Sequence, residues 1–255
     1  MSRDIDFRRF EQEIDKWRIR RKDADDRKSY DEVFDKKNLL RIYKLFVDGV
    51  IEQLDFPIST GKEGNVFRAT TPEKDLVAVK IYRTSTATFK DMAKYIQGDP
   101  RFKGIAGNRI RLIMAWAQKE YRNLERLTEV GVRVPRPIAR RDNVIVMEYI
   151  GDEVAPAREM REVQLEDPEG VARKLLEYVR LAYQKAELVH GDLSEYNVLM
   201  KDQEPVIIDV GQTVLLDHPL AQELLERDLA NMARYFNKYG VEIDVQKELR
   251  EIRGA

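Results

Sequence analysis

Two segments in the second half of the chain combine carboxylates and an amide at a spacing that suits phosphoryl transfer. His190-Gly191-Asp192-Leu193-Ser194-Glu195-Tyr196-Asn197 has the pattern H-x-D-x-x-x-x-N, in which the Asp receives the proton of an attacking hydroxyl while the Asn coordinates magnesium. Twelve residues after Asn197, Asp209 follows an apolar run, where a buried charge would require a metal ion or strong hydrogen bonds. The sequence therefore predicts Asp192 as the base and Asn197 and Asp209 as metal ligands.

A glycine-containing segment in the first half of the chain fits a phosphate-binding loop. It approximates G-x-G-x-x-G-x-V with Ser in the first position, and its residues are Ser59, Thr60, Gly61, Lys62, Glu63, Gly64, Asn65 and Val66. Glycines let backbone N–H groups approach phosphate oxygens closely. By itself, a strand turn without any ligand is the simpler interpretation of two glycines.

A lysine fourteen residues after Val66 strengthens the phosphate interpretation. Lys80 closes the run Val77-Ala78-Val79-Lys80, and β-branched neighbours would direct its ammonium inward, where it requires an anionic partner. In the corresponding V-A-I-K pattern the lysine binds the α- and β-phosphates of ATP. We expect Lys80 to do so, with Ala78 lining the nucleotide site.

The helix expected over 112–130 supplies a candidate carboxylate for Lys80. Glu120 precedes an apolar stripe that would face the sheet, so it is the preferred partner. Glu125 and Glu129 on the same helix are alternatives, and a solvated glutamate is the default interpretation of any of the three.

An apolar strand expected over 144–150 would hold the adenine ring. In this interpretation the backbone C=O of Glu148 and the N–H of Ile150 bind the adenine edge, and Met147 lies beside it as the gatekeeper. The alternative is an ordinary buried strand.

Composition excludes several classes of protein. The 255 residues include no Cys and two His, so a thiolate zinc site, a disulfide and a cysteine nucleophile are excluded. Lys and Arg number 45 against 46 Asp and Glu, which leaves no global field to attract nucleic acid. No apolar run approaches the ~20 residues that a bilayer requires, and the N-terminus lacks a signal-peptide core, so we expect a cytoplasmic protein without membrane contact.

Hydrophobic periodicity predicts the elements around these motifs. Amphipathic helices are expected within 1–30 and over 31–54, with Pro57 as a stop, and an antiparallel hairpin is expected within 55–83. From Arg83 to Arg111 there are seven basic residues against two acidic ones, which marks a local basic insertion. Further elements are expected as a helix over 172–186, strands over 197–200 and 205–210, and a last helix over 221–239.

Together these motifs resemble the RIO family of atypical serine/threonine protein kinases. The segments 59–66, 190–197 and 207–212 carry the resemblance, with Asp217-His218-Pro219 following, and it extends over roughly 32–240. Val210-Gly211-Gln212 is similar to the type-one branch, because the type-two branch has Phe-Pro-Gln after the metal-binding Asp.

The resemblance implies an α+β, bilobal protein-kinase-like fold with extra N-terminal helices. The expected parts are N-terminal helices over 1–54, an N-lobe over 55–147 containing the insertion 83–111, and a minimal C-lobe over 148–255. It also implies a monomer that uses ATP with magnesium or manganese and acts on immature small ribosomal subunits and their rRNA. In this family the metal-binding Asp is thought to accept the γ-phosphate, a role that would fall to Asp209.

Three departures from ordinary protein kinases bear on the mechanism. Gly191 replaces the Arg that would bind a phosphorylated activation loop, so control of that kind is not expected. Ser194 replaces a Lys that would neutralise transition-state charge, so we expect slow phosphotransfer. Only 44 residues follow Gly211 (255 minus 211), too few for an activation segment and a peptide groove, so the C-lobe is expected to be truncated.

Two functions from different classes follow. The leading hypothesis is a Mg-ATP-dependent phosphotransferase or ATPase, acting by serine/threonine autophosphorylation or through an aspartyl-phosphate. The alternative is a nucleotide-gated module that binds rRNA through the insertion 83–111 and the N-terminal helices, with little kinase activity. A pseudokinase is disfavoured because Lys80, Asp192, Asn197 and Asp209 are all present.

Overall fold

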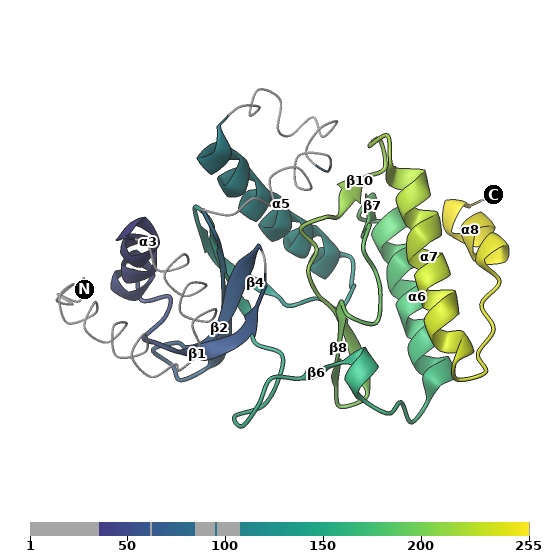
Figure 1. Ribbon diagram of the computed structural model, residues 1–255, viewed down its shortest axis with the longest axis horizontal. Coiled ribbons are helices and arrows are strands. Elements are labelled where there is room, and N and C mark those ends of the chain that lie inside the picture. Colours follow the sequence, from purple (N-terminus) through teal and green to yellow (C-terminus); the bar gives the residue numbers. More distant parts are fainter. Residues whose placement is uncertain (1–35, 62, 85–94, 96–107, 255) are drawn as a thin grey trace. The chain divides into compact units, whose positions relative to one another are not determined.

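The computed structural model describes residues 36–61, 63–84, 95 and 108–254, and these divide into two compact units (Figure 1). Among the described residues, unit 1 comprises 36–84, 108–118 and 137–149, apart from residue 62. Unit 2 comprises 95, 119–136 and 150–254. The expected helix within 1–30 lies outside the described residues, as does nearly all of the insertion 83–111 between Thr84 and Asn108.

Unit 1 is built on a five-stranded antiparallel sheet in the order β1-β2-β3-β5-β4. Its strands are β1 (Gln53–Thr60), β2 (Gly64–Thr70), β3 (Leu76–Tyr82), β4 (Pro137–Arg141) and β5 (Val144–Glu148). Helix α3 (Lys36–Val47) packs on one face, where Ile42 and Leu45 join Phe67, Val79 and Val146 in a continuous apolar core. The alternation of the strands thus fixes which face carries the core and which face carries other side chains.

The helix predicted over 31–54 is wrong beyond residue 47. Helix α3 ends at Val47, Gly49 adopts a left-handed φ of 71°, and strand β1 begins at Gln53. Pro57 lies inside β1 rather than acting as a helix stop. It is tolerated there because β1 is an edge strand, and the pairing with β2 shifts register on both sides of Pro57.

The long helix α5 (Arg109–Glu129) follows the insertion and agrees with the helix predicted over 112–130. The Asn108 side chain caps it by accepting a hydrogen bond from the N–H of Arg111 at 3.1 Å. Residues 109–118 of α5 are grouped with unit 1 and residues 119–129 with unit 2.

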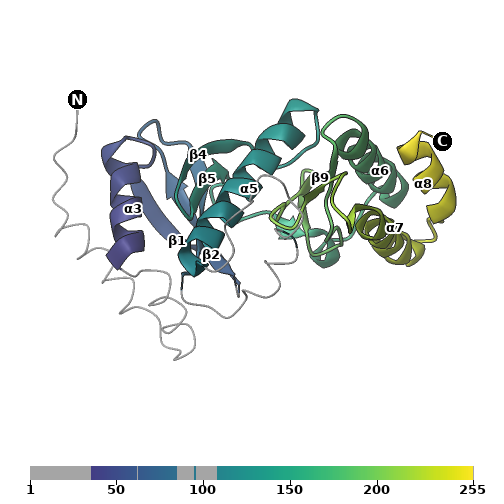
Figure 2. The same ribbon diagram turned by 90° about the horizontal axis from the view of Figure 1, so that it is seen from above.

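Unit 2 combines three helices with short strands. The helices are α6 (Pro168–Gln184), α7 (Ala221–Asn237) and α8 (Val245–Arg253), which pack against one another (Figure 2). The hairpin of β8 (Val198–Lys201) and β9 (Glu204–Ile207) is extended by β6 (Arg158–Glu159), and a short 3₁₀ turn, η2, spans Met160–Glu162. A separate pair joins β7 (Leu188–Val189) to β10 (Val214–Leu215).

Helix α8 has no counterpart among the elements predicted from the sequence. Asp244 caps its N-terminus by accepting from the N–H of Lys247 at 3.0 Å, and Gly254 ends it with a φ of 73°. Its buried Leu249 and Ile252 face the unit's core. Within the described residues, no helix has both the length and the apolar character needed to cross a bilayer.

Candidate phosphoryl-transfer site

The β8–β9 hairpin places two of the predicted site residues at one end of unit 2. Val198 pairs with Ile207, and beyond that pair the N–H of Ile208 donates to the carbonyl of Asn197 at 2.9 Å. Asn197 immediately precedes β8 and Asp209 follows β9 by two residues, so both lie at the same end of the hairpin. Asp209 has a left-handed φ of 58°.

Asp209 differs from its sequence-based description in one respect. The strand before it is buried, as Val206 and Ile207 show, but the Asp209 side chain is exposed. The argument that its charge must be compensated because it is buried is therefore wrong. Its candidacy rests instead on its position beside Asn197 and Asp192.

The amide of Asn197 joins it to Asp192. Its Nδ2 donates to the Asp192 backbone carbonyl at 2.7 Å and to Oδ2 of the carboxylate at 3.2 Å. Because the amide nitrogen is used in this way, Oδ1 is the atom through which Asn197 would coordinate a cation. Within the catalytic loop, residues 190–197, the two motif residues Asp192 and Asn197 are thus hydrogen-bonded to each other.

Gln212 is a member of this cluster that the sequence did not single out for a role. Its Nε2 donates to Oδ2 of Asp192 at 3.2 Å, so the carboxylate accepts from two amides. In the sequence analysis, Gln212 only helped to favour the type-one branch of the family. No known spacing linked it to Asp192.

The environment of Asp192 suits a group that accepts a proton. Burial raises the pKa of Asp192 above its usual range, and the nearby Asp209 carboxylate raises it further. The guanidinium of Arg227 and the hydrogen bond from Asn197 act in the opposite direction. A general base works best when its pKa approaches the working pH, so the net upward shift favours this role.

His190 braces the catalytic loop through hydrogen bonds of both ring nitrogens. Its Nδ1 lies 3.2 Å from the N–H of Asp192, which can only donate, so Nδ1 accepts. The proton of the neutral ring is then on Nε2, which donates to the carbonyl of Ile208 at 3.1 Å. One imidazole therefore joins the loop to the residue that precedes Asp209.

Asp228 on helix α7 anchors the backbone of the same loop, and the sequence analysis did not identify it. Its Oδ2 accepts from the N–H of Gly191 at 2.7 Å and its Oδ1 from the N–H of Leu193 at 2.9 Å. The side chain is 1% exposed, and burial raises its pKa to about 6 against the effect of these hydrogen bonds. The available signal was an Asp among apolar positions of an amphipathic helix, between Leu225 and Leu229.

Gly191 is required by the local backbone. Its φ is 78°, and a Cβ there would lie 3.2 Å from a methyl carbon of Leu224. Its carbonyl also accepts from the guanidinium of Arg227. The substitution of Gly for the usual Arg thus coincides with a conformation that favours glycine.

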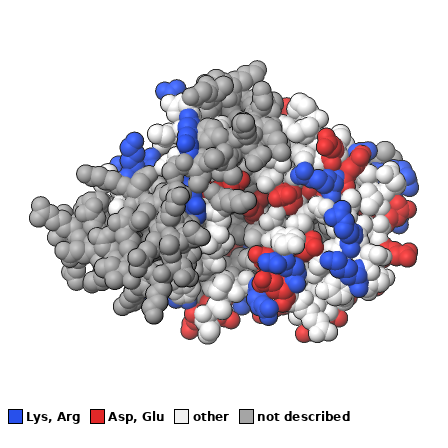
Figure 3. Space-filling model, in the orientation of Figure 1, with Lys and Arg blue, Asp and Glu red and all other residues white. Residues whose placement is uncertain are grey.

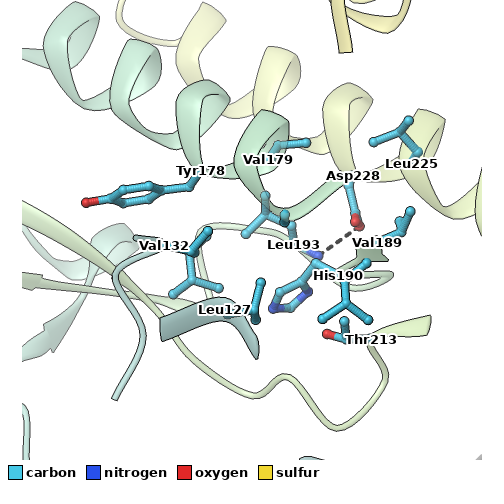
Figure 4. A pocket seen from close by; sticks show the side chains of 13 residues that line it. Leu127, Val132, Tyr178, Val179, Val189, His190, Leu193, Thr213, Leu225 and Asp228 are labelled. Atoms are coloured by element: carbon cyan, nitrogen blue, oxygen red, sulfur yellow. Dashed lines mark hydrogen bonds between the residues drawn. The ribbon is translucent and has the colours of Figure 1, made fainter. Parts of the chain in front are cut away.

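A cavity of about 20 Å³ lies beneath the catalytic loop (Figure 4). His190, Thr213, Asp228 and Tyr178 are the polar residues of a lining that is otherwise apolar, including Leu127 and Val179. This volume holds roughly one water molecule, so the cavity is a packing void and not a substrate site.

The glycine-containing segment of unit 1 joins β1 to β2. The N–H of Gly61 donates to the carbonyl of Gly64 at 2.9 Å, which closes a tight turn. A Cβ on Gly64 would lie 2.3 Å from the carbonyl oxygen of Ile81, so strand pairing alone demands glycine there. Ser59 and Thr60 are exposed at the end of β1, and Lys62 lies outside the described residues.

Glu63 and Asn65 are engaged within unit 1. The carbonyl of Glu63 accepts from the N–H of Arg83 at 2.9 Å, and Oδ1 of the buried Asn65 accepts from the Arg83 guanidinium at 3.0 Å. Arg83 therefore ties the end of β3 to the segment between β1 and β2.

Strand register gathers four predicted nucleotide-binding residues on one face of the sheet in unit 1. Val66 on β2 is opposite Lys80 on β3, and Ala78 is opposite Met147 on β5. Paired residues, and residues two apart in a strand, share a face. That face is opposite the one that packs on α3, which carries Phe67, Val79 and Val146.

The structure distinguishes Glu120 from its alternatives. Glu120 is 2% exposed, whereas Glu125 and Glu129 on the same helix are exposed. Lys80 belongs to unit 1 and Glu120 to unit 2, so their ion pair stays a prediction. The same holds for the adenine contacts assigned to Glu148 of unit 1 and Ile150 of unit 2.

The donor set in unit 2 fits magnesium. Among the described residues there is no group of three or more His, Cys, Asp or Glu side chains that could hold a metal ion. Magnesium does not require one, because it is usually bound by one or two carboxylates together with water and substrate phosphates. Asp209 and Oδ1 of Asn197 provide such a set, and the two carboxylates of Asp192 and Asp209 make a cation favourable there.

Comparison with known proteins identifies the family. A model of the RIO domain matches residues 65–249. The RIO-type serine/threonine-protein kinase Rio1 of Haloferax volcanii is 46% identical over 237 residues, which are 93% of this chain and 81% of the relative. The protein of the same name from Methanocaldococcus jannaschii is 41% identical over 234 residues, 92% of this chain and 80% of the relative.

A solved structure supports the fold. The crystal structure of the Rio2 kinase-ADP/Mg²⁺-phosphoaspartate complex from Chaetomium thermophilum is similar with a TM-score of 0.64 and 21% identity, covering 84% of this chain and 65% of that chain. The predicted α+β protein-kinase-like fold with a truncated C-terminal lobe is thereby confirmed. On the strength of the domain match and the archaeal relatives, this chain is a member of the RIO family of protein kinases, in its Rio1 branch.

Proposed function

We propose that the protein is a Mg-ATP-dependent phosphotransferase of the RIO type. The observation that carries this proposal is the convergence of Asp192, Asn197 and Asp209 at one end of the β8–β9 hairpin. A base and two magnesium ligands at one place are what phosphoryl transfer requires of this part of the protein.

In transfer to a hydroxyl, Asp192 acts as the base. Its carboxylate takes the proton of the attacking serine or threonine hydroxyl, whose oxygen forms a bond to the γ-phosphorus. The bond from that phosphorus to the β,γ-bridging oxygen breaks, and ADP leaves. Asn197 and Gln212 hold the Asp192 carboxylate in place for this step. Magnesium, when bound by Asn197 and Asp209, neutralises charge on the phosphates.

In an ATPase cycle, Asp209 is itself the acceptor. An oxygen of its exposed carboxylate attacks the γ-phosphorus, ADP leaves, and water later hydrolyses the aspartyl-phosphate with Asp192 as the base. The Rio2 kinase-ADP/Mg²⁺-phosphoaspartate complex from Chaetomium thermophilum, a structure of similar fold, supports this route.

Unit 1 would contribute the groups that hold the nucleotide. The face of its sheet that carries Val66, Ala78, Lys80 and Met147 is the one opposite α3, so these side chains are not used in that core. We assign the ammonium of Lys80 to the phosphates of ATP, and the segment 59–66 to the phosphates as well.

Steady-state turnover of ATP tests the proposal. Asp192→Ala and Asp209→Ala are each expected to abolish turnover while the circular dichroism spectrum and the melting temperature stay close to those of the wild type. Asp202→Ala is the matched control, because Asp202 is an exposed Asp at the opposite end of the same hairpin. Turnover that survives both substitutions would refute the proposal.

The chemical form of the product separates the two routes. Phosphate that is acid-stable and bound to serine or threonine indicates transfer to a hydroxyl. Phosphate that is released by hydroxylamine, forms in Asp192→Ala and is lost in Asp209→Ala indicates an aspartyl-phosphate, because hydroxylamine cleaves acyl phosphates.

We also propose that the protein acts in maturation of the small ribosomal subunit. In this proposal the insertion 83–111 binds the rRNA of the immature subunit. The specific observation is its charge, seven basic residues against two acidic ones. On the face drawn in Figure 3, by contrast, basic and acidic side chains are interspersed over the described surface. Binding to small-subunit rRNA that weakens with salt and with charge reversal at Lys90 and Lys94 would support it. Unchanged binding in that variant would contradict it.

A further inference from the structure

Two buried polar side chains of helix α5 donate hydrogen bonds to the backbone of the turn that follows Asp209. Nζ of Lys119 donates to the carbonyls of Gly211 and Thr213, both at 2.6 Å. Nδ2 of Asn123 donates to the carbonyls of Val210 at 2.9 Å and Thr213 at 3.2 Å. Lys119 and Asn123 lie four residues apart, on one face of the helix, and both are fully buried. We call these four hydrogen bonds the carbonyl clamp.

The clamped turn carries two groups of the candidate site. Asp209 lies immediately before Val210, and the side chain of Gln212 donates to the carboxylate of Asp192 from within the turn. Three backbone carbonyls in four residues point toward α5, so the path of the chain from 209 to 213 depends on the donors that receive them. All these residues belong to unit 2.

An ammonium at 0% exposure indicates that the clamp is more than incidental packing. Burying a charged group is unfavourable unless hydrogen bonds compensate it, and hydrogen bonds from a charged donor are stronger than neutral ones. A neutral apolar side chain at position 119 would fill the same space but would leave the carbonyls of Gly211 and Thr213 without this donor.

We propose that Lys119 and Asn123 are positioning residues for phosphoryl transfer, which fix Asp209 for the metal and Gln212 for Asp192 through the carbonyl clamp. This inference rests on the proposed function. It assigns roles outside the motifs of the catalytic loop and the phosphate-binding segment. Neither residue touches the reacting atoms, so each acts through the turn that it holds.

The test uses the full chain with Lys119→Met. Because this change removes buried hydrogen bonds and so lowers stability as well, Asn123→Leu and Gln212→Met are tested beside it. Binding of a fluorescent ADP analogue is measured as Mg²⁺ is varied, and in EDTA. Partners that orient metal ligands typically contribute about 10- to 100-fold to metal affinity, so Lys119→Met should raise the Mg²⁺ midpoint by about that factor. The affinity for the analogue in EDTA should stay within about twofold of the wild type, because the nucleotide groups assigned to unit 1 are unchanged.

The variants are expected to differ from one another in a defined way. Asn123→Leu should shift the Mg²⁺ midpoint less than Lys119→Met, because it removes only neutral hydrogen bonds. Gln212→Met should slow ATP cleavage and leave the midpoint unchanged, because it loses only the bond to Asp192. Lys185→Met, at an exposed lysine of unit 2, and Leu249→Ala, which destabilises α8, are the controls.

Hydrogen exchange provides a readout that does not depend on activity. Amides in the segment 209–213 should exchange faster in Lys119→Met than in Leu249→Ala. The two variants are compared at temperatures equally far below their own melting temperatures. An unchanged Mg²⁺ midpoint together with unchanged exchange in that segment would overturn the proposal. Failure of the wild type to bind Mg-nucleotide or to cleave ATP would instead overturn the proposed function. The exchange result would then show only whether the carbonyl clamp orders the segment 209–213.

Discussion

The two units position their candidate functional residues by different means. In unit 1, Val66, Lys80 and Met147 owe their common face to the register of β2, β3 and β5. In unit 2, the catalytic loop and the turn after Asp209 contain little regular structure, and side chains from helices hold their backbone instead. Asp228 accepts from two N–H groups of the loop, and Lys119 donates to two carbonyls of the turn.

This difference has a physical consequence for how each unit responds to mutation. A sheet distributes its backbone hydrogen bonds over many residues, so the loss of one side chain leaves the register in place. A loop whose backbone is held by a few buried side chains depends on each of them, because a buried backbone donor or acceptor left unpaired costs about 1–3 kcal/mol. Single polar substitutions should therefore act more strongly in unit 2, whereas unit 1 should be sensitive chiefly where two backbones approach closely.

The largest effect is expected from Asp228→Ala. It removes the acceptor of two buried N–H groups, so we expect a loss of about 2–6 kcal/mol in the free energy of unfolding, together with a loss of turnover. Urea denaturation measures it. Asp244→Ala is the comparison, since that exposed cap accepts from one N–H of α8 and should cost only about 0.5–2 kcal/mol. Equal losses would contradict the contrast between a buried anchor and an exposed cap.

The same carboxyl should make stability depend on pH. Burial raises the pKa of Asp228 from 3.8 to about 6, so the folded chain binds its proton more tightly than the unfolded chain does. This contribution to stability is complete below pH 3.8 and is lost as pH rises through about 6. At 1.36 kcal/mol per pKa unit it amounts to at most about 3 kcal/mol.

Comparison with Asp228→Asn isolates that contribution, because other carboxyls titrate equally in both proteins. The free energy of unfolding of the wild type, minus that of Asp228→Asn, should fall between pH 4 and pH 7. A difference that rises over this interval would mean that the two N–H donors outweigh burial and lower the pKa of Asp228.

The motif residues could be predicted from the sequence, whereas their supports could not. Asp192, Asn197 and Asp209 lie in short patterns with fixed spacing, and strand alternation placed Lys80 correctly on β3. Lys119 and Asp228 act on backbone groups 92 and 37 residues away. Because every residue but proline offers both an N–H and a C=O, such bonds leave no pattern at the receiving end.

The errors in the fold have equally specific causes. The apolar period of α3 continues through Val50 and Leu54, so only Gly49 marked the helix end, and Leu54 is buried in a strand instead. Helix α8 spans nine residues and is mostly polar. Its position depends on tertiary contacts, including ion pairs of Arg180 with Glu248 and Glu251 at 3.4 and 3.0 Å.

Two glycines of unit 1 provide the next test. Gly64→Ala would place a Cβ 2.3 Å from the backbone oxygen of Ile81, so β2 and β3 must separate, and we expect a loss of about 1–3 kcal/mol. Gly61→Ala, three residues earlier, meets its nearest atom at 3.4 Å and should change stability by less than about 0.5 kcal/mol. Thermal unfolding distinguishes them. Similar melting temperatures for the two variants would contradict this prediction, because they would show that β2 and β3 can separate at Gly64 at little cost.

The smallest effect, and a change of opposite sign, is expected from Thr213→Val. The carbonyl of Thr213 belongs to the carbonyl clamp, but its hydroxyl is buried without a hydrogen-bond partner among the described residues and faces the 20 Å³ cavity. Valine has nearly the same shape and removes the unpaired hydroxyl, so the free energy of unfolding should rise by up to about 1 kcal/mol. Urea denaturation measures the change. A loss of stability would mean that a water molecule in the cavity pairs with the hydroxyl, and that in unit 2 even this side chain takes part in holding the turn.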